Sequence, residues 1–345
     1  MRELVPLIFV ICVSHAAACK FSFSKMRCVS NSTACQFRLR LGSPLCQPKA
    51  SSASASAARQ LLPVIDVAPF LRSGATAADR LEVAKAWDAA MSSMGLVQII
   101  GHGVDSEAID GLAESGRAFF EQSHEQKMES CLHKGYGFGG YVPQGVEAVA
   151  RSTGASAPAD VVENIVFSYR GDPELEATMP PEPPEFAPFV RRYWQQMEEL
   201  TSSLMRLSAL GLGLDEAHFA TPFAHPKCNL RIAYYPPMDA NVSRRPHGHR
   251  YGAHTDYTGF TILRQDPSVA GLEAQTVAGE WVTVPPRKDA LVINAGDLIQ
   301  VCIHTHTRAH ACAQLNTLSA CIYQRGRPDP GVDERPVALA ASSSH

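Results

Sequence analysis

The feature that most constrains the fold of this chain is a change in the hydrophobic pattern after Pro222. Before it, apolar residues recur at helical spacing, and after it short β-rich runs alternate with turn residues. These runs cover residues 230–235, 258–263, 271–277, 281–284 and 290–294. Short, regularly spaced strands are typical of a sandwich or barrel. Helices that precede such strands favour α+β packing around one core.

The part of the chain before Pro222 predicts helices with few strands. The expected helices cover 77–94, 106–121 and 188–214, and the expected strands cover 62–66 and 95–100. Residues 135–158 are rich in glycine and lack periodicity, so we expect a loop there. The sequence contains no internal repeats.

Composition excludes several classes of protein. The net charge of −3 over 345 residues indicates no basic face for nucleic acid. No apolar run is long enough to span a bilayer, so we expect no membrane association of the mature form. We also expect a monomer that acts on a small-molecule substrate. Of the ten cysteines, only Cys131 and Cys228 lie in the middle of the chain. The middle therefore indicates a reduced, intracellular domain, with Cys228 as a small buried hydrophobe.

Residues 1–60 have the composition of a targeting leader. Leu4 to Val13 is apolar, Arg2 precedes this stretch, and the three alanines 16–18 offer a cleavage site. Lys20 to Arg59 contains no acidic residue and many serines and alanines, as transit peptides do. A signal peptide followed by a transit peptide predicts a plastid reached through the secretory route. Secretion, or a disordered tail on a cytoplasmic protein, is the alternative. We expect residues 1 to about 60 to be removed and to contribute nothing to the core.

One short motif carries metal chemistry. His254 and Asp256 are two residues apart just before an expected strand. In an extended segment such residues point to the same face, so an imidazole and a carboxylate can aim at one point. With one more histidine they would form the facial triad of non-haem iron(II) oxygenases. A His-x-Asp pair alone is weak evidence, because the chain has thirteen histidines and a solvated histidine-rich loop would also contain it.

The surrounding residues resemble the isopenicillin-N-synthase-like family of iron(II)- and 2-oxoglutarate-dependent dioxygenases. The likeness covers roughly residues 62–300, in order and with similar spacings. It is carried by the stretches Pro63–Asp66, Gly95–Gln98, His102–Val104, Phe119–Phe120, Asn229–Pro237, Gly252–Thr258, Gly271–Ala274, Gly279–Pro285 and Asn294–Gln300. Because several separate motifs agree, the resemblance is more specific than the His-x-Asp pair alone.

The resemblance implies a double-stranded β-helix, or jelly roll, in residues 226–300, flanked by an N-terminal helical region in 61–225. It implies that His254 and Asp256 bind iron(II), and that 2-oxoglutarate and O2 are co-substrates in the oxidation of a small organic molecule. Tyr235 stands where many members place a tyrosine near 2-oxoglutarate; a tyrosine of the barrel core is the alternative. Ala233 replaces the asparagine often found two residues before it. Substrate specificity would fall to residues 135–166 and the helix in 188–214.

The resemblance ends at Gln300. The family continues with a Trp-Thr-Asn-Asp-like turn, a distal histidine and an Arg-x-Ser that holds 2-oxoglutarate, and the expected pattern is missing here. His310 is the nearest candidate for the third iron ligand. The final barrel strands also lack candidates, so open sheet edges would remain. Two functions stay open: an active oxygenase, and an inactive member that is a binding module or an unstable product.

Residues 301–345 predict an irregular tail. Gln300-Val301 can be encoded CAG-GTG, the usual look of a splice donor, and residues 304–307 can be encoded as a CA repeat. Val332 to Leu339, shifted by one base under suitable codons, can give Trp-Thr-Asn-Asp-Arg-Trp-Arg-Ser, the turn expected before the distal histidine. We therefore expect a retained intron followed by an exon in the wrong frame. A natural disordered tail would also fit this composition.

Overall fold

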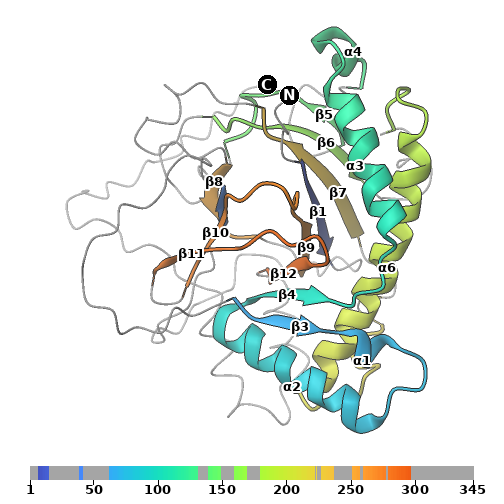
Figure 1. Cartoon of the computed structure of the whole chain (residues 1–345), viewed down its shortest axis with the longest axis vertical. Coiled ribbons are helices and arrows are strands. Elements are labelled where there is room, and N and C mark those ends of the chain that lie inside the picture. Colours follow the sequence, from blue (N-terminus) through green and yellow to red (C-terminus); the bar gives the residue numbers. More distant parts are fainter. Residues whose placement is uncertain are drawn as a thin grey trace, which may run out of the picture.

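The computed structural model contains two sheets that share a core cluster, with helices against the larger one (Figure 1). The structure describes residues 7–14, 39–41, 62–130, 139–148, 159–168, 179–221, 223, 227–236, 251–256, 259–276 and 279–296. Helices and strands pack around shared cores, which confirms the expected α+β class.

The larger sheet has eight strands in the order β3-β4-β12-β9-β1-β7-β6-β5. The smaller sheet has four, in the order β11-β10-β2-β8. All pairs are antiparallel except β3 with β4. The strands are β1 (Leu7–Ser14), β2 (Leu39–Leu41), β3 (Val64–Asp66), β4 (Leu96–Ile100), β5 (Gly140–Val142), β6 (Glu163–Ser168), β7 (Lys227–Tyr234), β8 (Tyr251–His254), β9 (Phe260–Arg264), β10 (Leu272–Gln275), β11 (Trp281–Thr283) and β12 (Leu291–Ala295).

Local sequence signals account for the helices. α2 begins with a capping box, in which Thr76 and Asp79 satisfy each other's backbone N–H groups, and ends at Gly95 in the left-handed region at φ 65°. Such a cap contributes about 1 kcal/mol to helix stability. The helices are α1 (Ala68–Leu71), α2 (Ala77–Met94), α3 (Ser106–Phe120), α4 (His124–Glu129) and α6 (Phe186–Gly211).

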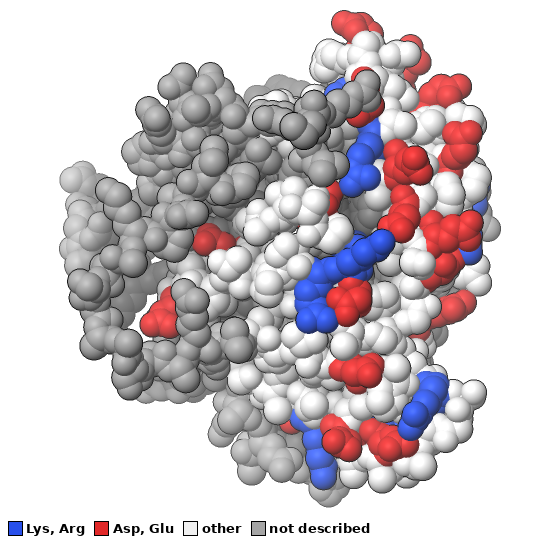
Figure 2. Space-filling model, in the orientation of Figure 1, with Lys and Arg blue, Asp and Glu red and all other residues white. Residues whose placement is uncertain are grey.

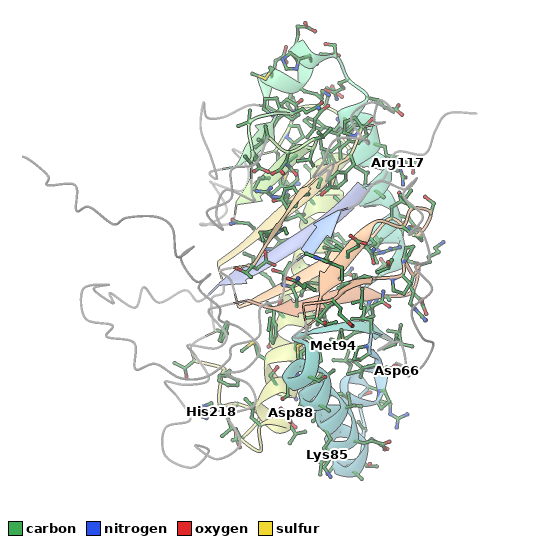
Figure 3. The ribbon with its side chains drawn as sticks, turned by 90° about the vertical axis from the view of Figure 1, so that its left-hand side faces the viewer. Asp66, Lys85, Asp88, Met94, Arg117 and His218 are labelled. Atoms are coloured by element: carbon green, nitrogen blue, oxygen red, sulfur yellow. The ribbon has the colours of Figure 1, made fainter. Side chains whose placement is uncertain are left out.

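α6 runs along the sheet and joins the other helices to it. Its inward face, from Phe186 to Ala209, lies in the main core cluster. Trp87 of α2 donates a hydrogen bond to Ser208 of α6 at 3.0 Å, and its ring packs edge-on against Phe260 of β9. In Figure 3, Met94 lies where α2 meets the strands. Helices and strands thus contribute to the same core clusters.

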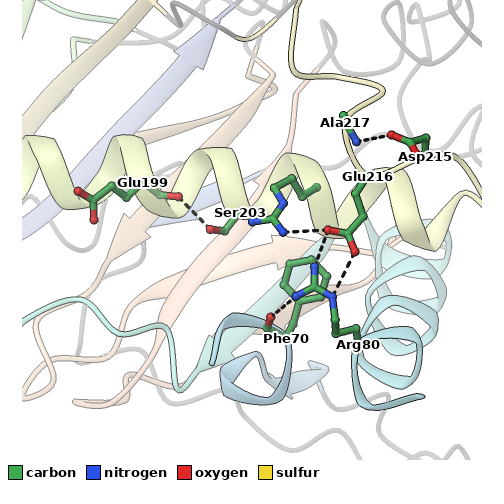
Figure 4. Close-up of polar contacts among 8 residues, drawn as sticks. Phe70, Arg80, Glu199, Ser203, Asp215, Glu216 and Ala217 are labelled. Carbon is green, nitrogen blue, oxygen red and sulfur yellow. Dashed lines mark hydrogen bonds and ion pairs between the residues drawn. The ribbon is translucent and has the colours of Figure 1, made fainter. Parts of the chain in front are cut away.

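A charged cluster joins α1, α2 and α6 to the segment that follows α6 (Figure 4). Arg80 of α2 and Arg206 of α6 both bind Glu216, at 2.5 and 2.9 Å. Hydrogen bonding from Arg80, more than from Arg206, lowers the pKa of Glu216. Arg80 also donates to the Phe70 carbonyl at 2.9 Å, which ties α1 to the same cluster.

Most elements expected from the sequence are confirmed. α2 has the expected bounds, α3 and α6 differ from expectation by a few residues, and the five runs after Pro222 correspond to β7, β9, β10, β11 and β12. The expected loop in 135–158 differs, because Gly140–Val142 pairs with β6 and Tyr141 is buried against Phe119. A strand of three residues is too short to show a periodicity in the sequence.

The N-terminal stretch differs most from expectation. β1 lies between β7 and β9, and β2 lies between β10 and β8, where the final barrel strands were expected to be missing. The expectation that residues 1–60 contribute nothing to the core is therefore corrected for Leu7, which lies in the main core cluster, while residues 7–14 and 39–41 form strands of the two sheets. The physical reason is that an apolar, β-branched run suits a buried central strand as well as a signal-peptide core.

The surface in view carries both signs of charge. Figure 2 shows Lys and Arg interspersed with Asp and Glu on the side of α3 and α6. Among the described residues, no helix is long and apolar enough to cross a membrane. The predicted irregular tail, 301–345, lies outside the described residues.

Candidate iron site

β8 and the turn after it bring the predicted ligand pair together. His254 ends β8, and Asp256 follows two residues later. The His254 Nε2 and Asp256 Oδ1 atoms lie 3.3 Å apart, and the two side chains are 13% and 14% exposed. The structure therefore aims both side chains at one point, as the spacing predicts.

The neighbouring strands fix the Asp256 carboxylate. Thr261 of β9 and Asn294 of β12 face each other in register and both donate to Asp256 Oδ2, at 2.5 and 2.8 Å. Burial, the largest effect, raises the pKa of Asp256. Hydrogen bonds and charge from His254, with the bonds from Asn294 and Thr261, outweigh it and bring the pKa to about 2. The group is thus a carboxylate at neutral pH, with Oδ1 turned toward His254.

This donor pair fits iron(II). One imidazole nitrogen and one carboxylate oxygen are two of the three ligands of the non-haem iron triad. In the part of the chain that the structure describes, no group of three or more His, Cys, Asp or Glu side chains converges as a metal site. His310, the predicted third ligand, lies outside the described residues.

Tyr235 lies in the interior of the barrel. It is 4% exposed and packs with Ala233, Leu263 and Val292 in the smaller core cluster. Burial raises the pKa of its hydroxyl well above 10, with a further contribution from Tyr251. The hydroxyl therefore stays protonated and able to donate a hydrogen bond.

A polar cluster beside the ligand pair was not predicted. Arg231 of β7 donates through Nη1 to Glu147 Oε2 at 2.7 Å and to the Tyr251 hydroxyl at 3.3 Å. Asn164 of β6 donates to the same Glu147 oxygen at 3.0 Å. A charged residue in the middle of the apolar run 230–235, four residues before Tyr235 and hence on its face, is the signal that could have revealed it.

Two family models match this chain. Residues 62–188 match the family model for the non-haem dioxygenase in morphine synthesis N-terminal region, and residues 226–314 match that for the 2OG-Fe(II) oxygenase superfamily. The second match includes the position of His310 and extends beyond Gln300.

Individual proteins are also similar to this chain in sequence and structure. The chain is 30% identical to homoarginine-6-hydroxylase 2-ODD-C23 of Glycine max, over 70% of this chain and 76% of that protein. It is 31% identical to the 2-oxoglutarate-Fe(II) type oxidoreductase ppzC of Metarhizium rileyi, over 69% of each. The crystal structure of a full-length Neurospora crassa protein in complex with alpha-KG and thymine superposes with a TM-score of 0.59 and 26% identity, covering 69% of this chain and 74% of that one.

Proposed function

Because the chain belongs to the 2OG-Fe(II) oxygenase superfamily, we propose that His254, Asp256 and His310 hold its iron(II). The protein is an iron(II)- and 2-oxoglutarate-dependent oxygenase that oxidises a small molecule with O2. The observation that supports the ligand assignment is the approach of His254 Nε2 to Asp256 Oδ1, at 3.3 Å. The match of residues 226–314 to the family model supports His310. The comparisons do not favour an inactive member.

Iron(II), when bound, supplies the oxidising chemistry by activating O2 together with 2-oxoglutarate. The protein's part is to hold two donors ready and to exclude water. Thr261 and Asn294 occupy Asp256 Oδ2, which leaves Oδ1 turned toward His254. The donors are already oriented before metal arrives, so little order has to be created on binding.

We propose that the stretch 135–166 and α6 set the substrate specificity. Glu147 and Asn164 support this, because Glu147 accepts hydrogen bonds from both Asn164 and Arg231, and Arg231 also contacts Tyr251. Relatives act on or bind different small polar molecules, homoarginine in one case and thymine in another. The proposed substrate is therefore a small organic molecule whose polar groups reach this cluster. We also propose that the protein is a monomer and does not associate with a membrane.

The ligand assignment is tested by anaerobic titration with iron(II) and then 2-oxoglutarate. We expect His254→Ala and Asp256→Ala each to abolish the charge-transfer absorption of the iron–2-oxoglutarate complex, because a ligand is lost. His310→Ala should weaken it strongly, whereas His304→Ala and His306→Ala serve as matched controls and should not. If His254→Ala and Asp256→Ala bind iron(II) like the parent protein, the assignment is wrong.

Tyr235 is proposed to contact 2-oxoglutarate. We expect Tyr235→Phe to raise the dissociation constant of 2-oxoglutarate by about 10-fold, the equivalent of one hydrogen bond, and to leave the iron(II) affinity unchanged. Isothermal titration with iron(II) already bound measures the 2-oxoglutarate step, and a separate titration with iron(II) alone measures the other. An unchanged 2-oxoglutarate affinity with lower thermal stability would instead make Tyr235 a residue of the barrel core.

We propose that the protein is located in a plastid, reached through the secretory route by a signal and transit leader in residues 1–60. A fluorescent protein fused after residue 60 tests this, and accumulation of the fusion in the cytosol would contradict it.

A further inference from the structure

The cluster around Arg231 links four separate parts of the chain, one of them β6 with Asn164. Glu147 comes from the segment after β5, Arg231 from β7, and Tyr251 from the start of β8. The Glu147 side chain is 8% exposed and that of Arg231 27%. An ion pair this shielded is costly to break, because each partner would leave a poorly solvated charge behind. The pair with its two hydrogen-bonded neighbours is therefore a fixed structure beside the barrel interior.

Tyr251 connects this cluster to the ligand pair. Its hydroxyl accepts from Arg231 at 3.3 Å, and its ring meets the His254 imidazole edge-on, with ring centroids 5.1 Å apart and an interplanar angle of 88°. The two contacts are made by one rigid side chain. A shift of the hydroxyl would therefore move the ring against which the imidazole rests.

Neighbouring side chains contact both proposed ligands. Asp256 is fixed by hydrogen bonds from Thr261 and Asn294. His254 approaches Asp256 through Nε2, and its ring packs edge-on against Tyr251. Residues that orient metal ligands commonly affect metal affinity about 10- to 100-fold.

We propose that Glu147, Arg231 and Tyr251 form a chain of positioning residues that orients His254 for iron(II). This rests on the proposed function, since His254 must be a ligand. The chain also connects residues 139–148, in the stretch proposed to set specificity, to the metal site. A molecule that displaces Glu147 would thus alter the geometry of the iron ligand without touching the iron.

Tyr251→Phe tests the proposal with the smallest change. It keeps the ring and removes the hydroxyl to which Arg231 donates. We expect an iron(II) dissociation constant about 10-fold higher and a shifted charge-transfer band with 2-oxoglutarate. Glu147→Gln, which keeps the shape and removes the charge, should weaken iron(II) binding in the same direction.

Tyr141→Phe is the matched control. The Tyr141 hydroxyl donates to Glu163 at 2.7 Å, and Glu163 pairs with Lys127 at 2.6 Å, so it too belongs to a shielded cluster of a tyrosine, a carboxylate and a cation. This cluster joins β5 and β6 to α4, whereas His254 and Asp256 lie on β8 and the turn after it. We expect Tyr141→Phe to lower the unfolding temperature and to leave iron(II) affinity and the absorption band unchanged.

The outcomes distinguish a failure of the ligand assignment from a failure of the positioning chain. If His254→Ala retains iron(II) binding, the ligand assignment fails. If His254→Ala abolishes binding while Tyr251→Phe and Glu147→Gln bind iron(II) like the parent protein, His254 is a ligand but the positioning chain is overturned. Equal effects of Tyr251→Phe and Tyr141→Phe on iron(II) affinity would also overturn it, because the effect would then be one of general stability.

Discussion

His102 is a partly buried histidine that the fold holds neutral. Its Nδ1 accepts a hydrogen bond from the Val104 backbone N–H at 3.1 Å, which requires an unprotonated nitrogen. Burial, and then the positive charge of Arg264, lower its pKa from the usual 6.5, while Asp289 opposes them. The unfolded chain therefore binds more protons than the folded one just below pH 6.5. Stability contributed by this group is present above that pH and is lost as the pH falls.

We expect His102→Asn to reduce the loss of stability on acidification. Asparagine can accept from a backbone N–H two residues on, as His102 does, but it does not titrate. Urea unfolding of the metal-free proteins at about pH 7.5 and about pH 5.5, on either side of the histidine pKa, gives the comparison. The two should have similar free energies of unfolding at the higher pH, with the variant more stable at the lower. Parallel pH profiles for the parent and the variant would contradict this.

Residues that depend on local spacing were predictable, and those that depend on distant partners were not. His254 and Asp256 are two apart in an extended segment, so their convergence follows from strand geometry alone. Arg231 could be placed on the inner face of its strand. Its partner Glu147 could not, because the stretch that contains Glu147 has no periodicity to orient it.

At the scale of elements, β1 is the least expected and the most central. Val10 pairs with Arg231 of β7 on one side and with Leu263 of β9 on the other. Leu7 is 3% exposed and belongs to the main core. Because β1 alone stands between β7 and β9 in the order of the larger sheet, the two halves of that sheet meet through it.

Val10→Pro should destabilise the protein by about 2 kcal/mol or more, because proline cannot donate to the ladder and leaves a carbonyl of a neighbouring strand unpaired. Val10→Ile is the control, since it keeps both the N–H group and the β-branched side chain, and its effect should stay within about 1.5 kcal/mol. Chemical denaturation followed by circular dichroism measures both. Equal stability of the two variants would show that residues 7–14 are not part of the sheet.

The difference between α2 and β1 explains why element prediction succeeded unevenly. α2 contains its own start and stop signals at Thr76 and Gly95, so its bounds could be read locally. β1 has only an apolar composition, which fits a signal-peptide core equally well. Its identity as a strand depends on β7 and β9, and a pairing partner cannot be read from the strand itself.

On the scale of the whole molecule, the expected division into a helical region and a jelly-roll core is less sharp than the sequence indicates. β3 and β4 from the first region extend the larger sheet beyond β12, and β5 and β6 extend it beyond β7. The α+β class was predictable because the hydrophobic pattern of each segment reflects its local helical or strand periodicity. The sharing of one sheet was not, because it depends on edge pairing between strands far apart in sequence.

The place of β1 has a consequence for the synthesis of the protein on the ribosome. Residues 7–14 are made well before their partners, because β7 (Lys227–Tyr234) and β9 (Phe260–Arg264) follow much later in the chain. At a synthesis rate of about 5–20 residues per second, this strand waits roughly 10–50 s for its neighbours. During that interval an apolar segment is accessible to any receptor that binds nascent hydrophobic chains. The same eight residues could then either bind an export receptor or pair with β7 and β9, and the outcome would depend on which of these partners is reached first.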